Sequence, residues 1–87
     1  MSTKKVERSI TPAQCRAARA ILDMTQSQLA NSAALGLSTI VDFERERRYV
    51  SEHAVIAMRR ALERAGVEFI RQDGGGAGVR LKRSQLR

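Results

Sequence analysis

The chain has 87 residues, of which 16 are Lys or Arg and 9 are Asp or Glu, so its formal net charge is +7. This length fits one small domain with a thin core, which leaves little room for an extended catalytic cleft. No apolar run approaches the roughly 20 residues of a membrane helix, and the N-terminus lacks the apolar stretch of a secretory signal. One cysteine and one histidine cannot complete a structural zinc site. We therefore expect a reduced, cytoplasmic protein without metal or cofactor.

The basic residues are concentrated at the two ends of the chain. Residues 1–20 contain five basic residues and one acidic residue, and residues 71–87 contain the same numbers. Residues 21–42 contain two acidic residues and no basic one. The high isoelectric point of about 11.1 favours a polyanionic partner, above all nucleic acid, over a charge that serves solubility alone.

The first predicted helix runs from Pro12 to about Leu22 and follows a polar, basic segment, residues 1–10, which we expect to be a flexible arm. Thr11 and Gln14 have the spacing of a capping box, and proline suits the first helical position. Apolar residues then recur at helical spacing and predict one buried stripe, made of Cys15, Ala18 and Leu22.

Two more short helices are predicted after the first. A second capping box, formed by Thr25 and Gln28, begins the helix predicted from about Gln26 to Ala33. A tight turn over residues 34–36 separates it from a helix predicted over residues 37–45. Their predicted buried residues are Leu29, Ala30, Ala33, Ile40 and Phe43.

The fourth predicted helix begins after the cap residue Ser51 and ends at Gly66. Its predicted buried face consists of Val55, Met58, Leu62 and Ala65. Beyond Gly66 the apolar period changes to two over residues 67–70 and 79–82, which predicts a β-hairpin around a glycine-rich loop. The remaining residues, 83–87, form a basic tail.

A two-stranded hairpin is only marginally stable alone. We therefore favour a homodimer, paired through the hairpin of residues 67–82 or through the fourth helix, over simple docking of the hairpin on the helices. Three residues predicted to be exposed point to an apolar surface of this kind: Tyr49, Ile56 and Ile70.

A short helix, a tight turn near a glycine and a second short helix are typical of a helix-turn-helix. Residues at fixed spacing over residues 11–82 make the chain similar to the XRE family of phage-repressor-like proteins. They are Arg19, Thr25-Gln26, Leu29-Ala30, Thr39-Ile40 and Phe43-Glu44-Arg45, and then the segments Met58 to Phe69 and Gly78-Val79-Arg80-Leu81, which resemble an extension in small bacterial members.

This resemblance implies a mainly α fold. It is a lambda-repressor-like helix-turn-helix bundle of four short helices over residues 11–66, with a C-terminal β-hairpin over residues 67–82. The implied function is sequence-specific binding of double-stranded DNA to regulate transcription, as a dimer on a near-palindromic operator with the third helix in the major groove.

The resemblance also implies roles for individual residues. The outward face of the third helix would read base edges through Leu37, Ser38, Val41 and Asp42. Backbone phosphates would be contacted by Gln26, Thr39, Arg45, Arg47 and Arg48. An interior ion pair would join the first helix to the third through Arg19 and Glu44.

The chain departs from the family pattern at several positions. Ala34 stands where a glycine normally takes a positive φ, at a strain cost of about 1 kcal/mol. Gly36 replaces the usual serine cap, Glu46 replaces a glycine, and Val50 replaces a frequent proline. The third helix has no basic residue before Arg45, so phosphate affinity has to come from the arm, the following loop or the tail.

These departures leave open a second class of function, a protein-interaction module of the antitoxin or adaptor kind that keeps the fold without base-specific binding. We do not expect an enzyme, because the sequence shows no catalytic triad, paired carboxylates or metal cluster. The glycines of residues 74–76 lack the strand–loop–helix context and the Lys-Ser/Thr pair of a phosphate-binding loop. Cys15 is expected to lie in the core, and His53 is expected to lie on the surface.

Overall fold

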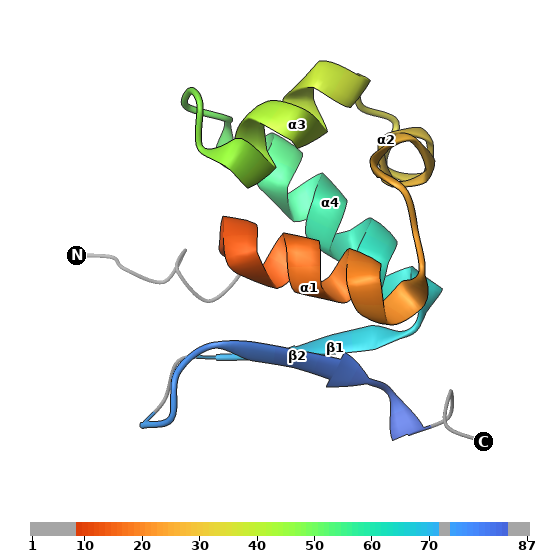
Figure 1. Cartoon of the computed structure of the whole chain (residues 1–87), viewed down its shortest axis with the longest axis vertical. Coiled ribbons are helices and arrows are strands. Elements are labelled where there is room, and N and C mark those ends of the chain that lie inside the picture. Colours follow the sequence, from red (N-terminus) through yellow and green to blue (C-terminus); the bar gives the residue numbers. More distant parts are fainter. Residues whose placement is uncertain (1–8, 72–73, 84–87) are drawn as a thin grey trace.

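The computed structural model describes residues 9–71 and 74–83. Within them the chain is mainly helical, as predicted, and ends in an antiparallel hairpin (Figure 1). Most of the predicted arm and tail lies outside the described residues. The elements are α1 (Pro12–Leu22), α2 (Gln26–Ala33), α3 (Leu37–Arg45), α4 (Glu52–Ala65), β1 (Val67–Ile70) and β2 (Gly78–Leu81). None of the helices in this part of the chain is long and apolar enough to cross a bilayer.

The starts of three helices are set by side-chain caps. The Thr11 hydroxyl accepts the Gln14 backbone N–H at 3.0 Å, and the Gln14 Oε1 accepts the Thr11 N–H at 2.9 Å. Thr25 and Gln28 repeat this capping box at the start of α2. The Ser51 hydroxyl accepts a backbone N–H in the first turn of α4. These bonds satisfy N–H groups that a helix cannot pair internally, which explains why the predicted starts are accurate.

The ends of α1, α2 and α3 share an unusual backbone conformation. Asp23, Ala34 and Glu46 follow these helices with φ of 56°, 58° and 55°. In each case the next residue's N–H returns to the last turn; at α2, the Leu35 N–H donates to the Ala30 carbonyl at 2.9 Å. The left-handed conformation costs an L-residue about 1–2 kcal/mol, so Ala34 carries the strain that its sequence position implies.

Glycine at these positions is expected to stabilise the protein. Ala34→Gly and Glu46→Gly should each raise the free energy of unfolding by about 0.5–1 kcal/mol, because the relieved strain exceeds the extra entropy of glycine in the unfolded chain. Urea unfolding followed by circular dichroism measures the change. Ala17→Gly, at an exposed position inside α1, is the matched control and should lose about 1 kcal/mol. A loss of stability at Ala34 or Glu46 would show that the left-handed ends carry no strain.

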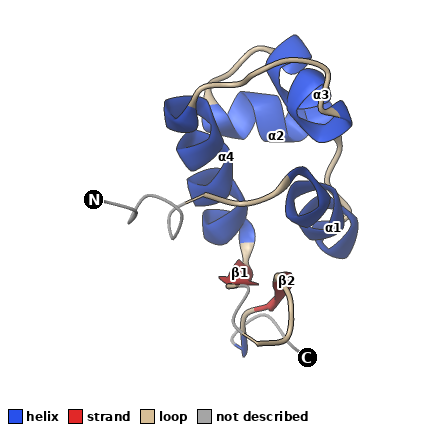
Figure 2. Ribbon diagram, turned by 90° about the vertical axis from the view of Figure 1, so that its left-hand side faces the viewer, coloured by secondary structure: helices blue, strands red, loops and turns tan. Residues whose placement is uncertain are grey.

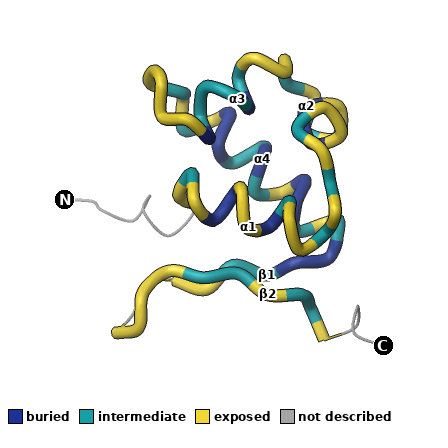
Figure 3. The backbone as a smooth tube through the Cα atoms, in the orientation of Figure 1, coloured by how far each residue is buried: buried dark blue, intermediate teal, exposed yellow. Residues whose placement is uncertain are grey.

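The core lies between the helices and one face of the hairpin (Figure 3). One core residue corrects the predicted arm: Ile10 is 5% exposed and packs with the core, so the segment over residues 1–10 is not entirely a free arm. The physical reason is local, since an apolar residue just before a helix cap typically packs back on the helix's fourth residue, here Cys15. The largest fully buried side chains are Cys15, Leu29, Ile40, Met58, Leu62 and Val67.

The hairpin docks on the helices of its own chain (Figures 1 and 2). The Gln14 Nε2 donates to the Gly78 carbonyl at 2.8 Å and to the Ile70 carbonyl at 3.3 Å, which ties α1 to both strands. At the other end, the Lys82 N–H donates to the Gly66 carbonyl at 2.8 Å. The hairpin thus docks on the helices, the alternative that the sequence favoured less, and pairing of two chains through the hairpin or α4 stays a prediction.

The second strand lies one residue earlier in the chain than predicted. Ile70 pairs with Gly78, so β2 begins one residue earlier than the strand predicted over residues 79–82. A glycine is a weak strand signal in a sequence, which explains why Gly78 was not predicted as part of the strand. Its carbonyl accepts a hydrogen bond from Gln14. Phe69 and Val79 form the next pair and pack on the core.

Candidate functional site

The helices α2 and α3 lie on the side of the molecule opposite to the hairpin, joined by residues 34–36 (Figures 1 and 2). Their inner faces are fixed by Leu29 and Ile40, both fully buried. On α3, Ile40 and Glu44 are one helical turn apart and both point inward, so the opposite face of this helix is presented outward. The arrangement of α3 thus follows from the burial of one apolar and one charged residue.

The outward face of α3 holds the residues predicted to contact base edges. Leu37 is 47% exposed, which is unusual for a large apolar side chain, and Ser38 is exposed beside it. Val41 and Asp42 continue the same face one turn later and are half-buried, as is Thr39. The face therefore offers a hydroxyl between aliphatic groups, which suits hydrogen bonds and methyl contacts with base edges.

The basic residues after this face have an arrangement that the sequence did not predict. The Arg48 Nε lies 2.6 Å from the Asp42 Oδ2, and the Arg47 Nη1 lies 4.0 Å from the Asp42 Oδ1. Both arginine side chains remain more than half exposed, whereas the Asp42 side chain is only 18% exposed. Arg48 also donates to the Tyr49 carbonyl at 3.3 Å, which holds the loop against α3.

This cluster changes the interpretation of Asp42. Its carboxylate faces Arg47 and Arg48, so its geometry favours orienting these two cations over accepting a hydrogen bond from a base. Arg45 is exposed at the end of α3. Together with Arg47 and Arg48 it forms a basic edge of α3. Helical spacing could not reveal the contact, because Arg48 lies beyond the end of α3 and its position depends on the left-handed turn at Glu46.

A buried ion pair joins α1 to α3 beneath this surface. The Glu44 side chain is 1% exposed, and Arg19 donates to both of its oxygens, from Nε at 2.7 Å and from Nη2 at 2.7 Å. The Gln26 Nε2 donates to the same carboxylate at 3.0 Å, and the Cys15 thiol donates at 3.2 Å. The structure thus contains the pair that the family resemblance implies, with two further donors that complete its hydrogen bonds.

Additional bonds connect this network to the backbone. The Arg16 Nη1 donates to the Glu44 carbonyl at 2.6 Å, at the C-terminal end of α3. The Arg19 Nη1 donates to the Met24 carbonyl at 3.0 Å, between α1 and α2. The Glu44 carbonyl is one of those that the end of a helix leaves unpaired. The two arginines of α1 therefore join this helix to the end of α3 and to the segment that leads into α2.

The network shifts the pKa values of three groups, and the hydrogen bond to Glu44 raises the pKa of Arg19. Burial by itself raises the pKa of the Glu44 carboxyl, but the hydrogen bonds from Arg19, Cys15 and Gln26 outweigh burial and hold this pKa below its ordinary value. Burial and the neighbouring carboxylate both raise the pKa of the Cys15 thiol far above its ordinary range. A buried thiol of this kind is unreactive, in keeping with a structural role for Cys15.

The lowered pKa of Glu44 predicts how stability depends on pH. Because the folded-state pKa is below the ordinary value of 4.5, this carboxylate contributes its stability above that pH and loses it as the pH falls through the folded-state pKa. The difference in unfolding free energy between the wild type and Glu44→Gln should therefore be constant from pH 7 to about pH 5 and then shrink. Urea unfolding of both proteins across this pH range tests the prediction. If the difference in unfolding free energy grew on acidification, the folded-state pKa of Glu44 would be raised and not lowered.

Gln26 lies at the N-terminal end of α2, as predicted, and its side-chain amide donates to Glu44. Its contact with a phosphate stays a prediction. A shallow hollow of about 410 Å³ lies beside Gln26, at the junction of α1 and α2. A phosphate there would meet the N-terminal end of α2, where backbone N–H groups favour an anion. The hollow is lined by Arg19, Ala20, Asp23, Met24, Thr25 and Gln26.

A scan against models of known protein families found no match for this chain, and a search of curated proteins found no relative. Function is therefore inferred from the residues and geometry of the chain itself.

Proposed function

We propose that this chain is a helix-turn-helix protein that binds double-stranded DNA at specific sequences and regulates transcription, acting in the cytoplasm as a homodimer. In this proposal α2 and α3 form the motif, and the outward face of α3 enters the major groove, which is about 12 Å wide and admits a helix. The observation that best supports this proposal is the exposed face around Leu37 and Ser38, which lies next to the guanidinium groups of Arg47 and Arg48.

The charges of the described residues support this orientation. Arg45, Arg47 and Arg48 lie at or just after the C-terminal end of α3, and the hydrogen bond from Gln26 to Glu44 brings the N-terminal end of α2 close to this same end. Phosphates along this side of a major groove would meet the arginines and the N-terminal end of α2 while the outward face of α3 contacts the base edges. Arg19 and Glu44 hold α1 and α3 together and so maintain the position of this face.

One observation favours the second candidate, a protein-interaction module with the same fold. The outward face of α3 has no cation before Arg45, and Asp42 neutralises part of the charge of Arg48. A face with these properties is less favourable for phosphate contacts than one that carries lysine or arginine among its base-contacting residues.

Selection of bound duplexes from a random pool tests the proposal directly. We expect enrichment of a half-site, repeated in inverted orientation at a spacing of about one helical turn, roughly 34 Å. Fluorescence anisotropy on the enriched site and on a shuffled site then gives the specificity ratio. No enrichment at low salt, together with capture of a stoichiometric protein partner, would favour the interaction module instead.

The cluster of Asp42 and Arg48 gives a sharper prediction. Arg48→Ala should weaken binding to the enriched and shuffled sites by the same factor and reduce the salt dependence by about one phosphate contact, because a guanidinium that contacts phosphate carries no sequence information. Asp42→Asn should modestly strengthen the binding of both DNA sites, since it removes a negative charge and releases Arg48. Anisotropy titrations over a range of salt concentrations measure both effects. A changed base at one position of the selected site in Asp42→Asn would instead show direct base contact.

A further inference from the structure

A groove runs along α4 on the side of the molecule facing away from the Asp42 cluster. Its volume is about 390 Å³. All but one of its residues recur every three or four positions along α4, on a face different from the buried one that holds Val55, Met58 and Leu62. The groove is lined by Ala33, His53, Ile56, Ala57, Arg60 and Arg64.

The groove has an apolar floor, and two arginines lie along it. Ile56, Ala57 and Ala33 are half-buried, whereas Arg60 and Arg64 are exposed. The Arg64 Nη2 donates to the Ser32 carbonyl at 3.1 Å, so this guanidinium is held across the C-terminal end of α2. No acidic residue lines the groove.

Glu63, on the last turns of α4 beside Arg60 and Arg64, pairs with a different arginine. Its Oε2 accepts from the Arg59 Nε at 2.9 Å. The positive charge of Arg60 and Arg64 is therefore not compensated by a carboxylate lining the groove.

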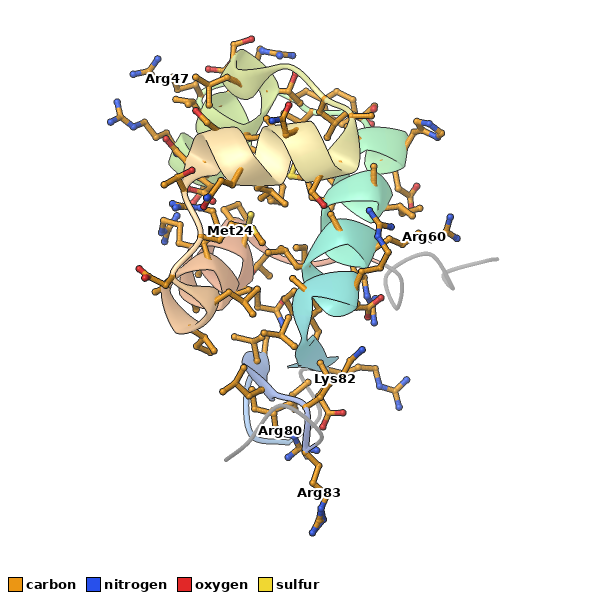
Figure 4. All side chains as sticks on the ribbon, turned by 90° about the vertical axis from the view of Figure 1, so that its right-hand side faces the viewer. Met24, Arg47, Arg60, Arg80, Lys82 and Arg83 are labelled. Carbon is orange, nitrogen blue, oxygen red and sulfur yellow. The ribbon has the colours of Figure 1, made fainter. Side chains whose placement is uncertain are left out.

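Figure 4 shows Arg60, which lines the groove, and Arg47, which follows α3, on opposite sides of the molecule. Arg60 extends from the right of the ribbon, and Arg47 extends from its upper left. A molecule in the groove would therefore leave the outward face of α3 accessible. The groove is therefore a second surface, distinct from the proposed DNA-binding face.

We propose that this groove binds an acidic amphipathic helix of a partner protein. Apolar side chains spaced by three or four residues on such a helix would cover Ile56 and Ala57, and its carboxylates would pair with Arg60 and Arg64. A second copy of this chain is a poor occupant, because a two-fold contact through the same patch would bring the arginines of both copies together. Nucleic acid phosphates would pair with the arginines but would leave the apolar floor uncovered.

A synthetic peptide tests the proposal with the full chain. The probe is a fluorescein-labelled helix of about 15 residues with leucines along one face and glutamates flanking them. Anisotropy at near-physiological ionic strength should give a dissociation constant of roughly 100 µM, as expected for a small interface. A scrambled peptide of the same composition has the same charge without the apolar face and should bind at least about tenfold more weakly.

Variants of the two surfaces distinguish the groove from general attraction of an acidic peptide. Arg60→Glu alone leaves the bond between Arg64 and Ser32 in place and should weaken binding at least about tenfold. Arg47→Glu makes the same charge change on the opposite side and should change peptide binding by less than about threefold. Circular dichroism establishes that both variants fold.

Several outcomes would overturn the proposal. These are no binding of the peptide, equal binding of the scrambled peptide, and equal losses in Arg60→Glu and Arg47→Glu. A change of oligomeric state in Arg60→Glu, measured by sedimentation, would make the groove an interface between copies. Loss of duplex DNA binding in Arg60→Glu without loss of peptide binding would assign the arginines to nucleic acid.

Discussion

Replacing Arg19 with methionine is expected to lower the free energy of unfolding by about 3–5 kcal/mol. The substitution leaves the carboxylate of Glu44, whose side chain is 1% exposed, with only the neutral donors Gln26 and Cys15. A buried charge without a counter-charge retains its desolvation cost and loses the attraction that offsets it. Methionine keeps most of the apolar stem, so the loss reports the charge rather than a cavity. Chemical unfolding followed by circular dichroism at neutral pH measures it.

The double variant Arg19→Met, Glu44→Leu separates this explanation from a simple loss of contacts. Removing both charges should recover most of the stability, because an apolar pair of similar volume incurs no desolvation cost. A double variant as unstable as Arg19→Met alone would mean that the hydrogen bonds of Glu44 stabilise the fold directly. Because the proposed DNA-binding face is carried by α3, the double variant should also show whether the ion pair is needed to orient it.

Ser38→Glu is expected to weaken binding to the enriched DNA site by at least about 100-fold. Ser38 is exposed on the outward face of α3, and a carboxylate there would oppose both the phosphates and the acceptor-rich edges of the major groove. The position is the second residue of α3, near the positive end of the helix dipole, so the charge should not destabilise the helix. Anisotropy with the enriched duplex gives the affinity, and urea unfolding verifies the stability.

His53→Glu is the matched control for Ser38→Glu. It also places a carboxylate at the second position of a helix, in this case α4, but in the groove away from the proposed DNA-binding face. It should change DNA affinity by less than about threefold, through long-range repulsion alone. If Ser38→Glu bound the enriched site as well as the wild type, the outward face of α3 would not contact DNA, and the interaction module would become the better proposal.

The helix boundaries were predictable because the interactions that set them are local. Thr11 with Gln14 and Thr25 with Gln28 bond across three residues, so both capping boxes are visible as short patterns in the sequence. Most buried faces were predictable for the same reason, since helical periodicity is a property of neighbouring residues. Ile10 was missed because it precedes the cap and stands in a basic segment, although its position before Thr11 was a usable signal.

The candidate site could be predicted only in part. The chain's own residues and the family resemblance pointed to the outward face of α3 and to the pair of Arg19 and Glu44. Neither source indicated that Asp42 holds Arg48, because that contact depends on a loop beyond the helix. The groove along α4 was also missed, since it forms only where the end of α2 packs beside α4.

The sequence by itself determined where the helices begin and end, and which side of each helix is apolar. The tertiary structure alone decided which distant groups meet: Gln14 with the carbonyls of Ile70 and Gly78, and Gln26 with Glu44. The physical reason is the range of the interactions. Caps and periodicity act within a few residues, whereas the partners of a buried polar group are chosen by the packing of whole helices.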